Sequence, residues 1–405
     1  MSQNEKKLGP MLATFVVAGN MIGSGVFLLP AGLAQTGSSS MIGWLVAAIG
    51  AAILACVYAL LGTIRPQKEG LTDYPVSAFN RGAGFLSWAA YWISCWVGNV
   101  AVILAAVGYL ASLFPGGISR FMESLILIGL IWGLALANLA GAKQMGRIAG
   151  ATLIIGILPI LAVTALGMIH FDADLFASSW NVSDAPLTAS IPPTILTIFW
   201  AFLGLESANA VAAVVKDPRR NLAIAAVGGV SMAALLYAAA CAALFGILPA
   251  AEMAASSAPF ADAATKVAGA GFGALIAIAA ITRTIGCAGG WFLVSAQSSR
   301  AAAVMGFLPA GLKEENHIER PVRNILLIAI LMTLVVFATL SPTLNGQFLA
   351  IVDFSVLLFM AVYAISAAAL IRFAAQLRDV RHRRLTRLLG GIAIVYCLFV
   401  AVGSF

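Results

Sequence analysis

The chain has 405 residues, of which 61% are hydrophobic and 10% are charged, and its formal net charge is +7. A soluble domain carries about 25% charged residues on its surface, so this composition excludes a soluble enzyme and a secreted disulfide-linked scaffold. Apolar runs of about 20 residues recur along the chain, and each is long enough to cross a hydrocarbon core of about 30 Å. The sequence therefore predicts an all-α polytopic membrane protein.

Eleven apolar segments are expected to span the membrane, and Pro or Gly residues separate most of them. In chain order they cover about 10–34, 41–64, 84–113, 121–140, 148–169, 191–214, 222–248, 272–299, 323–341, 347–373 and 387–405. With the N-terminus in the cytoplasm, only Arg120 and Lys266 of the 23 Lys and Arg residues fall in outside loops, and only Arg283 falls within a span. This bias follows the positive-inside rule, so the positive charge is expected to face membrane lipid and not nucleic acid.

The middle of the first segment is rich in small residues. Gly19-Asn20 is followed by Gly23-Ser24-Gly25, and Pro30 comes soon after. Irregular backbone at membrane depth is tolerated only where it lines a cavity or is buried in protein. The pattern indicates either a helix that unwinds near these glycines or a continuous helix that packs closely through small residues.

The sixth segment contains Trp200-Ala201-Phe202-Leu203-Gly204-Leu205-Glu206-Ser207. A carboxylate at the centre of a span costs about 2.5–3.5 kcal/mol to insert, so Glu206 is expected to face the bundle interior. One interpretation is that Glu206 takes part in gating or proton linkage. The other is that it is a structural residue that stays protonated inside the bundle. The first and sixth segments hold corresponding positions in two five-helix halves, and paired interruptions of this kind indicate an inverted-repeat transporter with a midplane site.

Two other spans carry polar and aromatic residues at four-residue spacing, so that each set shares one helix face. These residues are Tyr91, Cys95 and Asn99 in the third span and Arg283, Cys287 and Trp291 in the eighth. Trp200 and Trp291 offer π faces to a cationic or apolar ligand, although ordinary packing is the alternative. No metal-ligand spacing occurs among the Cys and His residues, so neither a metal nor a cofactor is expected.

These residues resemble the amino acid–polyamine–organocation transporter superfamily, and within it the bacterial arginine/agmatine antiporters. The resemblance runs from Leu8 to Phe405. Its most specific stretches are Gly19-Asn20, Gly23 to Pro30, Tyr91-Trp92, Cys95-Trp96, Gly98-Asn99, Gly204, Glu206-Ser207-Ala208, Val214-Val215-Lys216, Pro218, Arg220-Asn221 and Gly289-Gly290-Trp291.

The resemblance implies a leucine-transporter-type fold in a single transmembrane domain, residues 1–405. Two inverted five-helix repeats, about 10–169 and 191–373, would contain the discontinuous helices 1 and 6, and one peripheral helix would cover about 387–405. The chain ends one helix short of the family's usual twelve. A homodimer formed through peripheral helices is therefore left open.

The resemblance also implies a substrate site lined by Asn20, Met21, Ser24, Gly25, Tyr91, Cys95, Asn99, Trp200, Ala201, Leu205 and Trp291. The backbone of the first segment would bind the substrate carboxylate, and the backbone of the sixth would bind its α-amino group. Trp291 would stack on the substrate side chain, and Cys95 and Asn99 would contact its polar end. Trp200 would close the site as a gate, and Glu206 would be gating or proton-linked.

Two charged residues depart from the family pattern. Arg283 stands where the arginine/agmatine antiporters have a small residue, and Asp353 enters the tenth span near their serine-containing segment. They either form a structural ion pair or select the substrate by charge, in which case Arg283 would disfavour a cation and Asp353 would receive one. With Glu206 included, the charges inside the membrane sum to −1, which favours a cationic substrate.

The expected function is a secondary active transporter in the bacterial inner (plasma) membrane, with its N-terminus in the cytoplasm. It would exchange a cationic amino acid, such as arginine, for its amine or a related amino acid by alternating access. Exchange or proton-coupled transport of neutral amino acids is the alternative. An intramembrane sensor or enzyme is a remote alternative, because the spans lack the clustered acid and base groups that catalysis needs.

Overall fold

The computed structural model describes residues 9–23, 25–65, 73–207, 217–314, 321–341 and 343–403. All regular elements in these ranges are helical, which confirms the all-α class. They are α1 (Pro10–Met21), η1 (Gly25–Phe27), α2 (Leu29–Leu33), α3 (Ser40–Ile64), α4 (Asp73–Ala78), α5 (Arg81–Ala111), α6 (Arg120–Asn138), α7 (Ala142–Ile169), α8 (Ala173–Ser178), α9 (Leu187–Phe199), η2 (Trp200–Phe202), η3 (Leu205–Ser207), α11 (Pro218–Phe245), α12 (Ala250–Ala255), α13 (Pro259–Ala268), α14 (Ala270–Val304), η4 (Ala310–Leu312), α15 (Val322–Ala338), α16 (Leu344–Ala374) and α17 (Val380–Val402).

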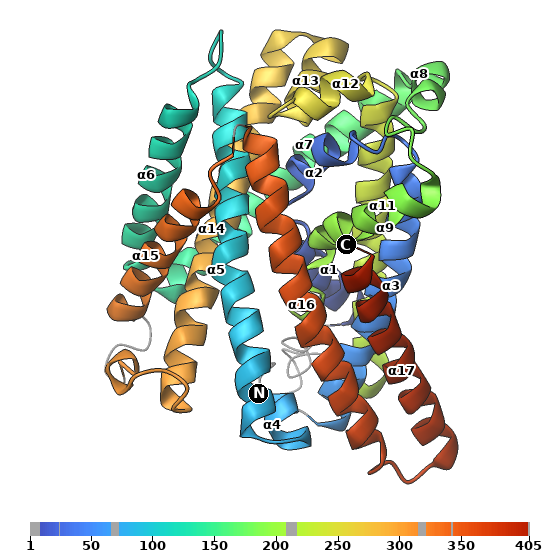
Figure 1. Ribbon diagram of the computed structural model, residues 1–405, viewed down its shortest axis with the longest axis vertical. Helices are drawn as coiled ribbons and strands as arrows, with labels where there is room; N and C mark the ends of the chain where they lie inside the picture. The colour runs from blue at the N-terminus through green and yellow to red at the C-terminus, as the bar shows by residue number, and fades with distance from the viewer. Residues whose placement is uncertain are drawn as a thin grey trace.

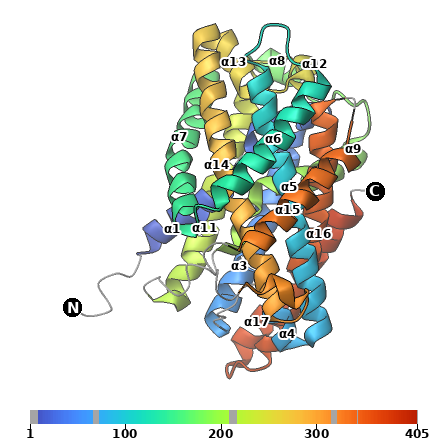
Figure 2. The same cartoon turned by 90° about the vertical axis from the view of Figure 1, so that its left-hand side faces the viewer.

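The long helices run roughly along the long axis of the molecule (Figure 1). The short helices α8, α12 and α13 gather at one end, and α4 lies at the other (Figures 1 and 2). Helix α5 packs against both α14 and α16, and α1 packs against α11. Because most of α5 is buried, this helix forms the centre of the bundle.

Eight described helices are long and apolar enough to cross a membrane, namely α3, α5, α6, α7, α11, α14, α16 and α17. Two shorter apolar helices cover Leu187–Phe202 and Val322–Ala338. Together with α1, they account for every apolar segment predicted from the sequence. The chain is therefore an integral, multi-pass membrane protein.

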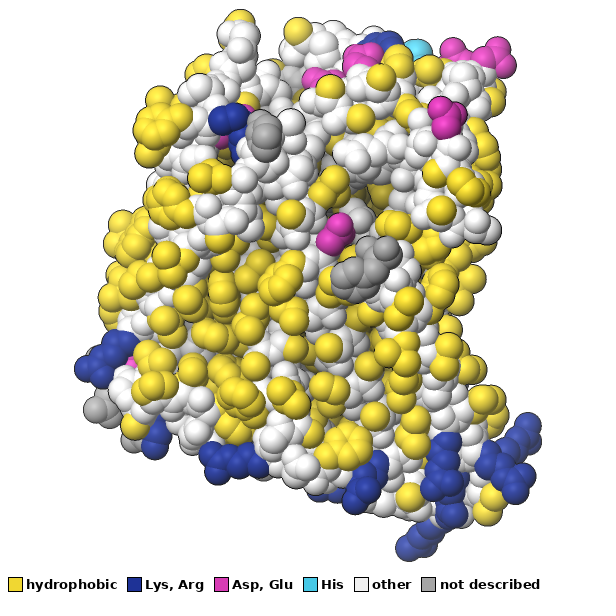
Figure 3. Space-filling view, viewed as in Figure 1, with side chains coloured by type: hydrophobic (Ala, Val, Ile, Leu, Met, Phe, Trp, Pro, Cys, Tyr) yellow, Lys and Arg dark blue, Asp and Glu magenta, His cyan; other side chains and the backbone are white. Residues whose placement is uncertain are grey.

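The surface has the distribution of side chains that a bilayer requires. Figure 3 shows hydrophobic side chains across the middle of one face, with Lys and Arg gathered at the lower end and Asp and Glu mainly at the upper end. Large apolar side chains such as Leu235, which is 73% exposed, point outward. An apolar belt between two polar ends matches a hydrocarbon core flanked by water.

The first apolar segment is broken where the sequence predicted. Helix α1 ends at Met21, and the next residue, Ile22, has ψ 75°, which is not helical. The chain resumes as the 3₁₀ helix η1 at Gly25. Ser24, which the sequence placed in the substrate site, lies outside the described residues.

The sixth apolar segment is also broken. Helix α9 passes into η2, and the chain then turns extended at Leu203, with ψ 136°. Gly204 follows with φ +103°, a conformation that glycine adopts without steric cost from a Cβ atom. Both predicted discontinuities are thus present, whereas the inverted relation of residues 10–169 to 191–373 stays a prediction.

The last helix docks through an aromatic ring. Tyr396 of α17 lies against Gly50 of α3, where an added Cβ would come within 1.8 Å of the ring. The same ring lies 6.0 Å from that of Phe199, centroid to centroid. Gly50 therefore allows α17 to approach both α3 and the end of α9.

We expect Gly50→Ala to lower the melting temperature of the detergent-purified protein, because overpacking a tight contact costs about 1–3 kcal/mol. Gly129→Ala is the matched control, since a Cβ on that glycine of α6 would meet nothing within 4 Å. The two variants are compared by thermal unfolding, in which size-exclusion chromatography measures the fraction of protein that stays folded after heating. Equal melting temperatures would contradict the contact between α17 and α3.

Candidate functional site

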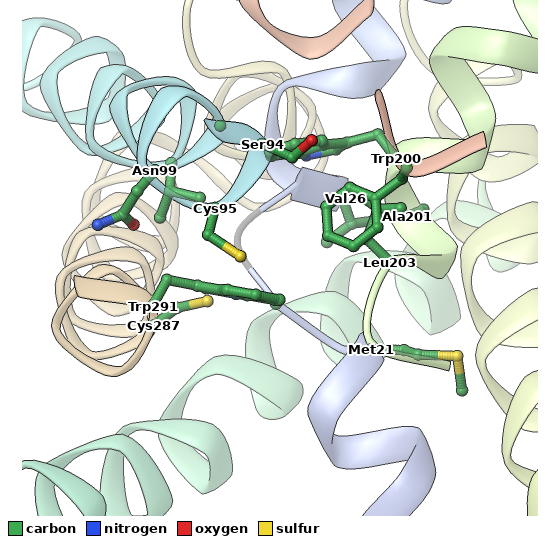
Figure 4. Close-up of a pocket in the computed structure, with 14 residues that line it drawn as sticks. Met21, Val26, Ser94, Cys95, Asn99, Trp200, Ala201, Leu203, Cys287 and Trp291 are labelled. Carbon is green, nitrogen blue, oxygen red and sulfur yellow. The ribbon is translucent and has the colours of Figure 1, made fainter. Parts of the chain in front are cut away.

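A cavity lies where the two helix breaks face α5 and α14. It contains about 480 Å³ of space not filled by protein atoms, part of it open to solvent. Figure 4 shows Cys287 and Trp291 projecting from α14 on one side, with Trp200, Ala201 and Leu203 on the other. The lining residues are Met21, Gly23, Val26, Ser94, Cys95, Gly98, Asn99, Val102, Trp200, Ala201, Leu203, Cys287, Trp291 and Phe359.

One face of α5 forms a wall of the cavity. Ser94, Gly98 and Val102 follow each other at four-residue spacing, and Cys95 and Asn99 lie beside them. The Ser94 hydroxyl donates to the carbonyl oxygens of Ala90 and Ser355, so it is already bonded. The wall therefore combines small residues, which leave space, with two side chains that can meet a ligand.

Asn99 has one hydrogen-bonding atom without a partner. Its Nδ2 donates to the Ala288 carbonyl at 3.0 Å, which turns the side chain toward α14. Its Oδ1 is buried and accepts no hydrogen bond. An unsatisfied buried acceptor costs about 1–3 kcal/mol, so a ligand N–H that reached this oxygen would recover that free energy.

Two indole rings lie at the cavity. An added Cβ at Gly98 would come within 2.8 Å of Trp200 Cη2, so the glycine lets this ring pack against α5. Trp291 lies one helical turn from Cys287 on α14. The cavity thus presents aromatic and sulfur surface, which suits an apolar chain or a cation over a ring face.

The broken end of α1 is held by side chains from two other helices. The Tyr237 hydroxyl donates to the Met21 carbonyl at 2.9 Å. Nη2 of Arg283 donates to the Ile22 carbonyl at 2.6 Å. Arg283 therefore bonds the backbone beside Gly23 and is not among the residues that line the cavity.

Six residues of the predicted substrate site line the cavity, namely Met21, Cys95, Asn99, Trp200, Ala201 and Trp291. The Met21 side chain points away from the cavity in Figure 4, so this residue contributes mainly backbone. Asn20 lies in the last turn of α1, and Gly25 begins η1. Tyr91 packs edge-on against Phe359, which places it behind the wall.

Leu205 and Glu206 lie in η3, beyond the residues that line the cavity. The Glu206 carboxylate is buried and accepts hydrogen bonds from the Tyr363 hydroxyl at 2.7 Å and from the Gly204 N–H at 3.1 Å. Tyr363 belongs to α16. Glu206 therefore links the break in the sixth segment to α16.

Arg283 and Asp353 have separate partners. Asp353 accepts a hydrogen bond from the Thr197 hydroxyl at 2.8 Å, which joins α16 to α9. Within the described ranges, the recorded ion pairs are Arg120–Glu123 and His382–Asp379. The ion pair between Arg283 and Asp353 that the sequence left open is not formed there, because each side chain bonds a different broken helix.

Several lining residues were not assigned to the site from the sequence, namely Gly23, Val26, Ser94, Gly98, Val102, Leu203, Cys287 and Phe359. Ser94, Gly98 and Val102 continue the face of Cys95 and Asn99, so helical spacing alone would have found them. Phe359 gave no such signal, because only tertiary packing brings α16 to the cavity. No group of side chains placed to hold a metal ion occurs within the residues described.

Comparison with known proteins agrees with this architecture. The family model described as "Amino acid permease" matches residues 8–405. The putrescine transporter PotE of Escherichia coli strain K12 is 34% identical over 372 residues, which cover 92% of this chain and 85% of PotE. PotE of Haemophilus influenzae is 34% identical over 370 residues, or 91% of this chain and 85% of that protein.

The cadaverine/lysine antiporter of Escherichia coli strain K12 is 33% identical over 405 residues, which cover 98% of this chain and 90% of the antiporter. The family model covers nearly the whole chain. The chain belongs to the amino acid permease family, within the amino acid–polyamine–organocation superfamily.

Proposed function

We propose that this transporter exchanges a cationic amino acid for a related amine by alternating access. The supporting observation is a cavity at two broken helices that is lined by two indole side chains and by Asn99, whose buried oxygen has no hydrogen-bond partner. The relatives include proteins named as a putrescine transporter and as a cadaverine/lysine antiporter. Arginine with its amine, and lysine or ornithine with theirs, are the substrate pairs to test first.

The positive end of the substrate fits the side of the cavity formed by α9. A helix C-terminus carries a partial negative charge, and α9 ends at Phe199 with Trp200 as its capping residue, which lines the cavity together with Ala201 and Leu203. Trp200 and Trp291 each add a cation–π contribution of up to about 2 kcal/mol for a desolvated ammonium group. Asn99 accepts an N–H from the far end of the same substrate.

The carboxylate of an amino acid substrate fits the restart of the first segment. Backbone N–H groups at the start of a helical turn attract anions, and η1 begins at Gly25 beside the lining residue Val26. Asn20 and Ser24 flank this region in the sequence. An amine without a carboxylate lacks this contact, so the two exchanged substrates share only the cation site.

The gate is proposed at the break in the sixth segment. Trp200 stands where α9 passes into η2, so a change at this junction moves its ring into or out of the cavity. Glu206 couples the junction to α16 through Tyr363 and is the candidate for gating or proton linkage. The Lys and Arg end in Figure 3 is proposed to face the cytoplasm, together with the N-terminus.

A neutral amino acid is the second candidate substrate. The observation that favours it is the absence of a carboxylate side chain among the described residues that line the cavity. Asp353, the candidate receptor for a substrate cation, bonds Thr197 instead. The net charge of the transported side chain is therefore the quantity to measure.

We expect purified protein in proteoliposomes loaded with putrescine, cadaverine or agmatine to take up radiolabelled ornithine, lysine or arginine. Uptake should depend on the internal amine, because exchange needs a substrate on both sides. Labelled leucine and alanine serve as neutral controls, and empty liposomes give the background. Uptake of neutral amino acids alone would favour the second candidate, and no uptake of any substrate would contradict the proposal.

We expect Asn99→Leu and Trp291→Leu each to weaken amine binding about tenfold, because the first removes an acceptor and the second an aromatic face. Trp132→Leu is the control, since Trp132 belongs to α6 and does not line the cavity. Binding of radiolabelled putrescine and lysine to purified protein measures the effect, and melting temperature checks the fold. Unchanged affinity in both variants would place the substrate elsewhere.

A further inference from the structure

We propose that Arg283 is a tethered cation that caps the broken end of α1 and holds the adjoining wall of the cavity in position. The proposal does not depend on which substrate the protein carries, since it concerns contacts within the protein. It makes Arg283 a positioning residue that acts through the backbone of α1. It differs from selection of the substrate by charge, which the sequence also allowed.

The first observation is the environment of the guanidinium group. The Arg283 residue is only 5% exposed, and its Nη2 lies 2.6 Å from the carbonyl oxygen of Ile22. Ile22 is the C-terminal capping residue of α1. Nε of Arg283 is buried and has no hydrogen-bond partner. The charged guanidinium group therefore bonds the backbone at the end of α1, inside the interrupted first segment.

The second observation is the charge at that helix end. The last carbonyl groups of a helix point away from it unpaired and carry about half a negative charge in total. Ending α1 inside the bundle leaves these groups without bulk water. Arg283 supplies a positive charge to Ile22, and Tyr237 supplies a hydroxyl donor to Met21. Arg283 thus forms its hydrogen bond with the helix end and not with a carboxylate.

The third observation is that α7 leaves room for this side chain. An added Cβ at Gly156 of α7 would come within 2.3 Å of Arg283 Cγ and 2.5 Å of its Cδ. One turn along, an added Cβ at Gly286 of α14 would come within 2.0 Å of Thr152 Oγ1 in α7. The two glycines bring α7 and α14 close together around the arginine, so its stem has little freedom to move.

These contacts reach the cavity through adjacent residues. Gly23 follows Ile22, and Cys287 lies one helical turn from Arg283, and both line the cavity. An added Cβ at Gly23 would lie 3.3 Å from Cys287 Sγ, so the two walls are already in close contact. Releasing Ile22 from Arg283 would let α1 separate from α14 at this point. The cavity would then lose shape for every substrate alike.

The central test compares Arg283→Ala with the wild type in the presence and absence of guanidinium. We expect Arg283→Ala to lower the melting temperature and to weaken binding of putrescine and lysine about tenfold or more, with their rank order unchanged although their net charges differ. Guanidinium chloride at low millimolar concentration should restore much of both losses. Sodium chloride at the same ionic strength should not, because it lacks planar donors.

Three further variants separate charge from shape. Arg283→Lys keeps the cation and should retain most of the affinity, whereas Tyr237→Phe removes only a neutral hydrogen bond and should have a smaller effect than Arg283→Ala. Gly156→Ala should be harmful by itself because its Cβ meets the arginine stem. Combined with Arg283→Ala, it should cost less than the sum of the two single effects, because the contacts with Cγ and Cδ are gone and only the contact with Cβ, at 2.5 Å, remains.

The outcomes are distinct. A change in substrate rank order on Arg283→Ala would show that the arginine selects by charge, and no response of that variant to guanidinium would show that no cation site remains at the α1 end. Either result overturns the proposal. If Arg283→Ala does not fold, the other two variants still test the proposal. A Gly156→Ala variant with the melting temperature and affinity of the wild type would contradict it, and so would an Arg283→Lys variant that binds no substrate. The melting-temperature readout needs no substrate, so it stands even if the proposed exchange fails.

Discussion

The need to satisfy backbone hydrogen bonds away from water governs this structure. A continuous helix pairs its own N–H and C=O groups, so it can cross a bilayer without help from side chains. In the first and sixth apolar segments this helical hydrogen bonding is interrupted midway, after Met21 and at Leu203. Because each break exposes backbone polar groups inside the bundle, side chains have to provide hydrogen-bond partners there.

The two breaks are treated differently. At the end of α1, Arg283 donates a hydrogen bond to the Ile22 carbonyl and Tyr237 donates one to the Met21 carbonyl. At the sixth segment the Gly204 N–H is taken by Glu206, and the aromatic ring of Trp200 faces the cavity. One end is therefore bonded by side chains of other helices, and the other leaves the ring of Trp200 at the cavity.

The fold was largely predictable because it follows from hydropathy and from two local interruptions. Each apolar segment corresponds to one described helix except the first and the sixth, which are broken, and the glycines around residues 19–25 and at 204 marked where the chain leaves helical geometry. Residues on a single helix face, such as Cys95 and Asn99, lie together at the cavity because a period of 3.6 residues fixes which neighbours share a surface.

What the sequence did not reveal depends on contacts between distant segments. The partner of Arg283 is a backbone carbonyl 261 positions away, and no pattern in the chain marks a carbonyl. Asp353 reaches Thr197 and Glu206 reaches Tyr363 by the same kind of long-range packing. Residue identity predicted that these charges need partners, but only the packing of whole helices decides which partners they meet.

The contact between Gly156 and the stem of Arg283 has a consequence for related sequences. An added Cβ at Gly156 would lie within 2.5 Å of Cβ, Cγ and Cδ of Arg283, so at this helix spacing a side chain at position 156 of α7 and one at position 283 of α14 exclude one another sterically. Homologues that carry a larger residue at the position of Gly156 should have either glycine at position 283 or a wider spacing of the two helices, and those that keep the arginine in this packing should keep glycine at position 156. The two positions are expected to covary as a pair, and an alignment of the family would show it.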